Sequence, residues 1–573
     1  MIPDFSRLKK NIKNKNECRF HFKMAVLADT ATQLLCTAIE GYGVEESMNI
    51  DIYEGPYNQV EAELYNPNSG LYAFKPDYVL IFESHKKLLK AFYKTTLKDR
   101  GFFADNKFET VKNYYNIVTE RLNAKFISFN FCEENDGVFG SAAAVYPASF
   151  LYQVRRLNFL LADSALKEKK FRIADMLSLQ NNIGLYGITD EKIYVSTGMA
   201  VSIDALPYVA KCITDPIKAG YGIIRKCLIL DLDNTVWGGV IGDDGINNIQ
   251  IGELGIGKAF SELQQWIKEL KNKGIILCVA SKNTESIAKE PFELHDDMVL
   301  KLEDISVFMA NWDNKVKNIQ RIQEILNIGF DSMVFLDDNP FERGIVKQYI
   351  PEITVPDLPE DPSLYLGYLK KLNLFENISY SDNDTERTKQ YQQEAKRVTD
   401  QKFFDNEEDF LKNLSMECTV EPVTAFNMPR TSQLTLRSNQ FNLRTVRYDE
   451  VALQDFAAKE NNYIWNFSLK DKYGDHGLIA IVMLEKNDDV LFIHNWIMSC
   501  RVLKRGMENF TRNYLAEFGS SMGCKLITGD YVPTPKNGIV KDHYEHLGFK
   551  KNHDLWELSL PANLLETFIK YKI

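Results

Sequence analysis

Residues 227–245 of this chain read CLILDLDNTVWGGVIGDDG, and this stretch decides the fold. The short apolar run Cys227–Leu230 predicts a buried strand. Asp231 and Asp233 follow it at a spacing of two, so both side chains share one face while the chain stays extended. The ligands of α/β proteins bind at this end of a parallel sheet. The two carboxylates would repel each other unless a cation lies between them or one takes up a proton. The stretch therefore predicts a chemical site rather than an Asx-rich turn.

The segment Asp231–Thr235 resembles the D-x-D-x-T motif of haloacid-dehalogenase-type (HAD) phosphatases. Its continuation, Trp237–Gly245, resembles the FkbH branch of that superfamily, and this longer match is the more specific one. FkbH-like proteins are known for phosphatase and glyceryl-transferase chemistry that loads a three-carbon unit onto an acyl carrier protein. The resemblance therefore implies an enzyme that acts on a small phosphorylated acid.

Composition places limits on the class of protein. The chain has 573 residues, of which 45% are hydrophobic and 26% charged, as in soluble globular proteins. Its net charge of −11 argues against a general binder of nucleic acids. The nine cysteines are scattered without any C-x-x-C, which indicates a reducing compartment and a cytoplasmic protein. Because no apolar stretch is long enough to span a bilayer, we expect no membrane partner.

The order of apolar and polar segments predicts an α/β chain of several domains. Short apolar runs alternate with amphipathic segments in residues 1–220 and again in 221–375, which is typical of α/β layers. Residues 376–415 are polar and charged and predict a helical linker. Residues 416–573 mix alternating strands with one long helix and predict an α+β domain. In the first domain we expect strands at 22–27, 78–82, 125–130 and 192–195.

Further predicted strands of the middle domain carry family residues. The strand 274–280 is followed by Ser281, which matches the Ser or Thr that hydrogen-bonds the transferring phosphoryl oxygens in HAD enzymes. Lys315 fits the lysine that neutralises charge on the nucleophile and the phosphate. Lys282 and Lys317 are alternatives for that role.

The resemblance also implies a metal site. The strand 333–336 is followed by Asp337 and Asp338, which would complete a cation site with Asp231 and Asp233. An all-oxygen site of carboxylates and phosphate suits magnesium, which takes few protein ligands and keeps waters.

The mechanism implied is covalent phosphoryl transfer. Asp231 would attack phosphorus to give an aspartyl-phosphate. Asp233 would protonate the leaving group and then activate water. The gaps from Asp231 to Ser281 and from Ser281 to Asp337 are too short for a cap domain. We therefore expect an uncapped HAD domain that faces a large substrate or is closed by a neighbouring domain.

The first domain resembles the SGNH-hydrolase fold. Its Asp29-Thr30 lies where that family has G-D-S after a strand, so Thr30 replaces the nucleophilic serine. A hydroxyl without a base to activate it is a poor nucleophile. We expect a non-catalytic domain that docks a partner or closes the phosphatase site.

The last domain resembles the GNAT acyltransferase fold. The segment 537–549 matches the N-x7-8-Y-x3-G-F ending of that fold, with Asn537 and Tyr544 at the named positions. The loop that in GNAT proteins cradles the pyrophosphate of coenzyme A corresponds here to Arg501, Arg505 and Gly506. The resemblance implies coenzyme A or a phosphopantetheine arm as the ligand. Upstream, 437–443 also resembles an FkbH-family motif. Its polar side chains could bind a polar ligand or form a buried structural network, and the sequence leaves both interpretations open.

Cys500 is the cysteine that we single out for catalysis. It ends a predicted strand and precedes two arginines near a helix N-terminus, all of which favour the thiolate. The leading hypothesis is a magnesium-dependent FkbH-like phosphatase that transfers the acyl group to an acyl carrier protein. The alternative is a HAD phosphatase fused to an acyl-CoA-dependent N-acyltransferase that acts on a sugar or other small metabolite. A third hypothesis is a binding scaffold with a vestigial site, against which the intact aspartates argue.

Overall fold

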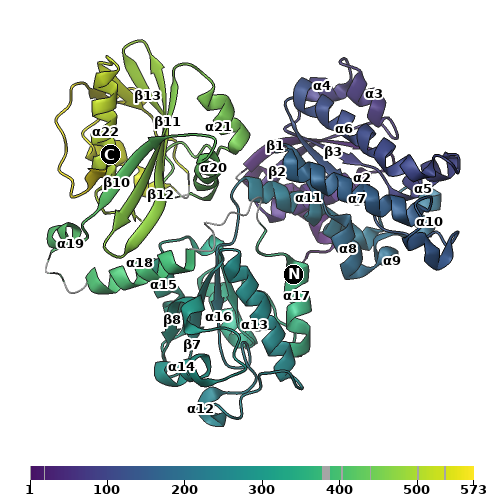
Figure 1. Ribbon diagram of the computed structural model, residues 1–573, viewed down its shortest axis with the longest axis horizontal. Helices are drawn as coiled ribbons and strands as arrows, with labels where there is room; N and C mark the ends of the chain where they lie inside the picture. Colours follow the sequence, from purple (N-terminus) through teal and green to yellow (C-terminus); the bar gives the residue numbers. More distant parts are fainter. Residues whose placement is uncertain are drawn as a thin grey trace. The chain divides into compact units, whose positions relative to one another are not determined.

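A computed structural model describes residues 2–18, 20–376, 387–401, 404, 406–438, 440–499, 502–534 and 537–572. The chain divides into two compact units, Met1–Lys218 and Ala219–Ile573, close to the predicted boundary at 220. Three separate sheets form the frame (Figure 1), one in the first unit and two in the second. In the described part of the chain, no helix is long and apolar enough to cross a membrane.

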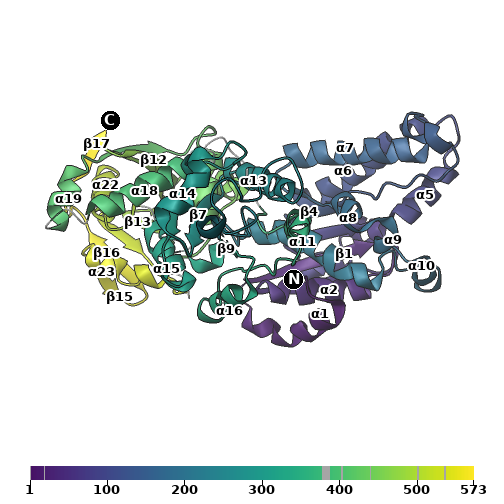
Figure 2. The same cartoon turned by 90° about the horizontal axis from the view of Figure 1, so that it is seen from below.

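The first unit is built on a five-stranded parallel sheet in the order β2-β1-β3-β4-β5. Helices α6 (Phe103–Arg121) and α7 (Phe150–Lys167) lie on one face, and α2 (Gln33–Glu45) lies on the other (Figure 2). The core between the sheet and α6–α7 is aliphatic and aromatic. The strands are β1 Phe20–Ala28, β2 Met48–Glu54, β3 Tyr78–Phe82, β4 Lys125–Phe129 and β5 Phe171–Ala174.

Three of the four predicted strands of this unit are present, and one prediction is wrong. Residues 192–195 lie in helix α10 (Glu191–Thr197), not in a strand. Asp190 caps this helix by accepting hydrogen bonds from the amides of Lys192 and Ile193. The cap and the first-turn Glu191 outweigh the strand propensity of the β-branched residues. Strands β2 and β5 had not been predicted.

The middle part of the chain forms a four-stranded parallel sheet in the order β8-β7-β6-β9. Two apolar cores cover its two faces. Between β6 and β7 the fully described segment 231–275 holds only the four-residue α12 and the longer α13. Between β7 and β9 the described segment 282–332 holds α14, β8, α15 and two 3-10 turns, so neither gap contains a cap domain. The elements are β6 Cys227–Leu230, α12 Ile241–Asp244, α13 Gly257–Asn272, β7 Ile276–Ser281, α14 Glu285–Leu294, β8 Ile305–Ala310, α15 Lys315–Leu326, β9 Met333–Leu336, α16 Pro340–Tyr349 and α17 Tyr365–Leu372.

The last part is a mixed eight-stranded sheet in the order β15-β16-β14-β13-β12-β11-β10-β17. Strands β10 to β13 run antiparallel to one another, whereas β13 and β14 are parallel and joined by helix α22 (Met507–Ser521). This arrangement fits the predicted α+β domain. The strands are β10 Glu417–Pro422, β11 Asn462–Asp471, β12 Gly474–Asn487, β13 Val490–Met498, β14 Leu526–Gly529, β15 Lys550–Asn552, β16 Leu555–Ser559 and β17 Lys570–Lys572.

The predicted linker contains two helices, α18 (Arg387–Gln401) and α19 (Glu407–Asn413). Two more helices, α20 (Met428–Arg437) and α21 (Glu450–Ala457), precede β11. Helix α20 contacts β12 and β13, so it covers the middle of the mixed sheet.

Candidate active site

The carboxyl ends of three neighbouring strands bring the predicted phosphatase residues together. Leu230, the last residue of β6, pairs with Val279 of β7 on one side and with Leu336 of β9 on the other. Asp231 comes next, and its amide donates to the carbonyl of Leu336 at 2.9 Å. Register therefore places the residues that follow β6 and β9 next to each other, with the end of β7 alongside.

Asp231, Asp337 and Asp338 form a compact group of carboxylates. One oxygen from each lies within 4.8 Å of the others, a spacing at which a single ion can contact all three. Asp231 and Asp337 are buried, and Asp338 is half-buried. Carboxylate oxygens are the ligands of hard divalent cations, so this group fits magnesium.

Lys315 lies against the same carboxylates. Its ammonium is 2.7 Å from Oδ1 of Asp231 and also donates to Oδ2 of Asp337. The side chain is buried at the first residue of α15, whose N-cap is Asn314. Of the three lysines considered from the sequence, Lys282 pairs with Glu342 instead, and Lys317 is exposed. The structure thus brings Lys315 to the predicted position.

Burial and mutual repulsion raise the pKa values of the buried carboxylates Asp231 and Asp337. Burial raises the pKa of Asp231, and Lys315 opposes that shift. Burial and then the neighbouring Asp231 raise the pKa of Asp337 to about 6. Burial lowers the pKa of Lys315, but the two carboxylates raise it more, so the net shift is upward. The carboxylates carry more negative charge than one lysine offsets, which favours a bound cation.

Three further residues hold the acidic group in place. The amide of Asn339 donates to Oδ1 of Asp337 at 2.8 Å. The buried hydroxyl of Thr235 accepts from the amide of Asp338 at 3.0 Å. The guanidinium of Arg343 donates to the carbonyls of Asp337 and Asp338 at 2.9 and 2.6 Å. Thr235 is part of the quoted motif, whereas no local signal marked Arg343.

Asp233 is held apart from the other carboxylates. Its Oδ1 accepts from the indole of Trp237 and from the amide of Ile241, both at 3.0 Å. Its Oδ2 accepts from the Asn283 amide group at 3.3 Å. The prediction that the Asp233 carboxylate is a metal ligand is therefore not supported, because its oxygens are directed to these donors and it lies outside the group of three. Trp237, Ile241 and Asn283 thus orient the Asp233 carboxylate independently of the other three carboxylates.

Ser281 is the last residue of β7 and is buried. It lies at the same sheet edge as Asp231, because β6 and β7 pair in parallel up to Leu230 and Val279. This is the position that the prediction requires for a hydroxyl facing a phosphoryl group.

The predicted ligand residues of the last domain are occupied internally. Arg505 is buried, and its guanidinium pairs with Glu394 of α18 and lies 3.6 Å from Asp471. His476 and Arg397 belong to the same buried ion network. Gly506, with φ of +77°, is the N-cap of α22. The helix therefore begins at Met507, six residues after Arg501. Arg505 thus stabilises the fold and does not face a phosphate, contrary to the prediction.

Asn537 and Tyr544 are likewise part of the core. Both are almost fully buried. The amide group of Asn537 donates to the carbonyls of Asn442 and Val532 at 3.0 and 2.9 Å, and its oxygen accepts from the amide of Thr534. For Asn537 the prediction of a cofactor contact is therefore not supported. The buried Tyr544 hydroxyl has no hydrogen-bond partner among the described residues, so its predicted cofactor contact stays a prediction. Cys500 and Arg501 lie outside the described residues.

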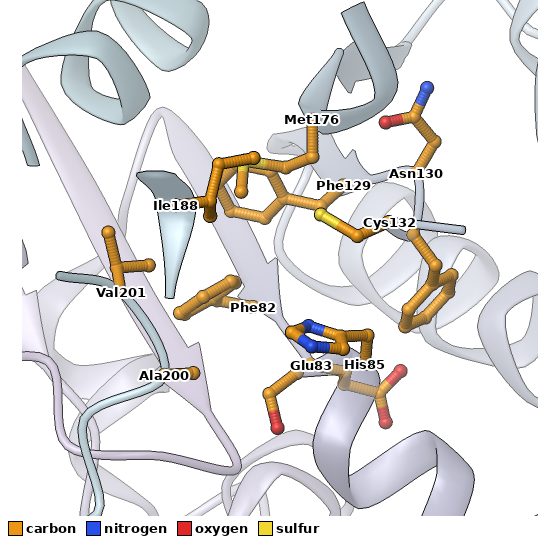
Figure 3. A pocket seen from close by; sticks show the side chains of 12 residues that line it. Phe82, Glu83, His85, Phe129, Asn130, Cys132, Met176, Ile188, Ala200 and Val201 are labelled. Atoms are coloured by element: carbon orange, nitrogen blue, oxygen red, sulfur yellow. The ribbon is translucent and has the colours of Figure 1, made fainter. Parts of the chain in front are cut away.

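The first unit carries a small pocket at the carboxyl ends of β3 and β4 (Figure 3). Its walls are mostly apolar, and the imidazole of His85 faces it together with the Cys132 thiol. Burial lowers the pKa of His85 to about 4 and raises that of Cys132 to about 12, so neither is charged at neutral pH. Thr30 does not line this pocket. Its buried hydroxyl has no hydrogen-bond partner among the described residues.

Comparison with known proteins identifies relatives over most of the chain. The family described as "FkbH, N-terminal domain" matches residues 23–218. The solved N-terminal part of protein BF1531 from Bacteroides fragilis, described as containing a phosphatase domain complexed with Mg, is 47% identical. That match covers 66% of this chain and 100% of the solved chain, with a TM-score of 0.64. No curated protein matches the chain.

Two acetyltransferases are similar over a quarter of the chain. The Escherichia coli ribosomal-protein-S18-alanine N-acetyltransferase is 14% identical, with a TM-score of 0.21, over 26% of this chain and 96% of its own. Aminoglycoside acetyltransferase AAC(6')-Ib, solved with coenzyme A, is 15% identical, with a TM-score of 0.21, over 25% and 95%. These scores are too low to support a conclusion about fold or ligand.

The strand order, the acidic group at the ends of β6 and β9, the FkbH match over 23–218 and the 47% identity to the phosphatase-containing relative agree with one another. The chain belongs to the FkbH-like family of the HAD superfamily.

Proposed function

We propose that this chain is a magnesium-dependent phosphatase that removes phosphate from a small phosphorylated acid through an aspartyl-phosphate. The observation that carries the proposal is the contact of Lys315 with both Asp231 and Asp337 beside Asp338. A buried lysine between two carboxylates offers positive charge where a phosphoryl group would bring more negative charge. Such preorganised charge is most of what a protein contributes to phosphoryl transfer.

Each residue has a distinct part in the proposed reaction. A carboxylate oxygen of Asp231 forms the new bond to phosphorus while the bond to the leaving oxygen breaks. Asp233 gives its proton to that oxygen and later accepts a proton from the water that hydrolyses the aspartyl-phosphate. Lys315 and Ser281 stabilise the charge on the equatorial oxygens.

Magnesium is proposed for the group Asp231, Asp337 and Asp338. The solved Bacteroides fragilis relative is described as complexed with Mg, and the all-carboxylate donors here suit the same ion. When bound, magnesium would offset the negative charge of the phosphate and of these carboxylates.

The experiment that tests this proposal compares Asp231→Asn with Asp243→Asn. The amide of the first variant is a poor nucleophile and a weaker ligand, so turnover of a phosphate ester should be lost. Asp243 is exposed on the short helix α12, so its variant should keep normal turnover. Intact-mass measurement after incubation with 1,3-bisphosphoglycerate should detect a phosphoryl adduct in the wild type and in Asp243→Asn but not in Asp231→Asn. Equal turnover by Asp231→Asn would reject the assignment.

We further propose that the Cys500 thiolate attacks the carbonyl carbon of an acyl phosphate, so that the carbon–oxygen bond to phosphate breaks, phosphate leaves and a thioester forms. The thiol of an acyl carrier protein in a biosynthetic pathway would then take the acyl group and restore the Cys500 thiol. Membership of the FkbH-like family supports this step, and Cys500 is the proposed acyl acceptor. Cys500→Ser should abolish transfer to a carrier protein and leave hydrolysis of simple phosphate esters unchanged, with Cys524→Ser as the control. The alternative is acyl transfer from coenzyme A to a small metabolite. A cytoplasmic location stays a prediction from the cysteine pattern.

A further inference from the structure

Strands β13 and β14 leave an opening between them as they diverge. They pair in parallel only over Val490–Ile493 and Leu526–Gly529. The second half of β13, up to Met498, therefore has an edge on this side that β14 does not cover. Buried backbone groups along such an edge need other partners. Amide-bearing ligands and peptides commonly supply them by adding as a further strand.

In this chain the segment Phe441–Leu443 supplies those partners. The amide of Leu443 donates to the carbonyl of Trp496, and the amide of Met498 donates to the carbonyl of Phe441, both at 3.1 Å. Asn442 lies opposite Ile497 in an antiparallel bridge. The segment thus pairs with β13 as a short strand would.

The same segment is also bonded on its other side. The carbonyl of Leu443 accepts from the amide of Val532, three residues beyond β14, at 2.9 Å. The carbonyl of Asn442 accepts from the side-chain amide of Asn537 at 3.0 Å. The segment therefore spans the opening from β13 to the chain that follows β14.

Burial and side-chain contacts hold the segment in this position. Phe441, Asn442 and Leu443 are all buried, and the Phe441 ring lies 4.9 Å from the His543 ring. The next residue, Arg444, pairs with Asp530 at 2.8 Å and donates to the carbonyl of His494 at 3.0 Å. These contacts place the segment in the domain core.

Coenzyme A, the cofactor that the sequence resemblance implies, does not fit this arrangement. Its pantetheine arm carries two amide groups and could pair with β13 only where Phe441–Leu443 already pairs. Arg505, the basic residue expected at its phosphates, is buried in ion pairs with Glu394 and Asp471.

We propose that Phe441–Leu443 is a built-in strand that closes this opening, so that the C-terminal domain binds no pantetheine arm along β13. This holds for an arm that belongs to free coenzyme A and for one borne by a carrier protein. It removes the acyl-CoA alternative for this domain and is independent of the phosphatase proposal. Carrier transfer would then have to proceed without strand pairing to β13.

The test uses the full chain, calorimetric titration and hydrogen exchange. Titrations with coenzyme A, acetyl-CoA and pantetheine should show no saturable binding up to about 1 mM. The amides of Leu443, Met498 and Val532 should exchange slowly, and their rates should not change when these compounds are added. Because pantetheine lacks the nucleotide of coenzyme A, binding of coenzyme A alone would indicate recognition of the nucleotide, and binding of both would indicate recognition of the pantetheine arm.

Three outcomes would overturn the proposal. Saturable coenzyme A binding with faster exchange at Leu443 and Met498 would mean that the segment is displaced. Saturable coenzyme A binding with unchanged exchange would place the cofactor elsewhere on the chain and overturn the inference that the acyl-CoA alternative is removed. Fast exchange of these amides in the free protein would mean that the opening is not closed.

A matched pair of variants tests how the segment is held. Asn537→Ala removes the donors to Asn442 and Val532, so exchange at Leu443 should become about tenfold faster, the equivalent of one lost hydrogen bond. Asn552→Ala alters an exposed residue of the same domain and should leave exchange at Leu443 unchanged. Equal rates in the two variants would contradict the closed segment.

Discussion

The indole nitrogen of Trp237 donates a 3.0 Å hydrogen bond to Oδ1 of Asp233, four residues earlier in the chain. Trp237 is fully buried, with its ring 5.9 Å from the Phe292 ring, so it cannot turn away from the carboxylate. The W-G-G part of the motif thus has a direct physical role. Gly239 has φ of +91°, a backbone conformation that other residues rarely adopt, so any substitution at this turn would be strained.

Trp237→Phe should reduce turnover without unfolding the domain. The ring stays, but Asp233 loses the hydrogen bond that orients it, so kcat for a phosphate ester should fall about 10- to 100-fold, which corresponds to about 1.4–2.7 kcal/mol. KM should change little, because substrate contacts remain. Trp266→Phe on α13 is the control. Among the described residues, the indole that donates to Asp233 is that of Trp237 and not that of Trp266. A change in KM alone would contradict the orienting role of Trp237.

Lys315→Met should separate activity from metal binding. Loss of the ammonium removes the positive charge beside the phosphate, and kcat/KM should fall by about 100-fold or more. The half-saturating magnesium concentration should not rise, because a lysine next to Asp231 and Asp337 repels the cation.

Lys317→Met is the control for this experiment, because Lys317 is exposed on the same helix. Magnesium titrations of phosphatase activity provide both quantities. A large rise in the magnesium requirement of Lys315→Met would show that Lys315 organises the ligands.

Thr30→Ala should leave phosphatase kinetics and stability nearly unchanged. The Thr30 hydroxyl has no hydrogen-bond partner among the described residues, so its removal should cost little or be slightly stabilising. Thr32→Ala is the matched comparison, because the Thr32 hydroxyl donates to Glu54 at 2.6 Å and its loss should lower the melting temperature. Esterase activity that disappears with Thr30→Ala would instead make the first unit catalytic.

The sequence predicted the parts of the site that lie next to strand ends. Asp231, Ser281 and Asp337 each follow an apolar run, and parallel pairing then brings them together. The sequence favoured Lys315 and left Lys282 as an alternative, because the pairing of Lys282 with Glu342 of a distant helix has no local signal.

Features that depend on long-range contacts were not predictable. Asp233 was expected to bind metal because its spacing matches that of Asp231, yet Trp237 and Asn283 direct its carboxylate elsewhere. Arg505 followed a loop pattern, but Glu394 of the linker helix pairs with it across more than a hundred residues. The motif 437–443 left a buried network open, but the pairing of Phe441–Leu443 with β13 has no local signal.

Stability of the C-terminal domain should fall as the solution becomes acidic, and His543 is one cause. Burial and then His546 lower the pKa of His543 to about 3 in the folded chain, from 6.5. Below pH 6.5 the unfolded chain therefore binds a proton that the folded chain does not, and the free energy of unfolding decreases as the pH falls toward 3. Through His543 alone, the free energy of unfolding should be about 2 kcal/mol lower at pH 5 than at pH 7.5.

His543→Phe should remove this part of the pH dependence, because phenylalanine does not titrate and fits among the rings of Phe441, Trp496 and Tyr544. Urea unfolding of the full chain at pH 7.5 and pH 5 measures it, with exposed His553→Asn as the control. The wild type and the control should lose stability between the two pH values by about 2 kcal/mol more than His543→Phe. An equal loss in all three proteins would mean that His543 is protonated in the folded state, and the aromatic surroundings would then have to be stabilising an imidazolium through cation–π contact.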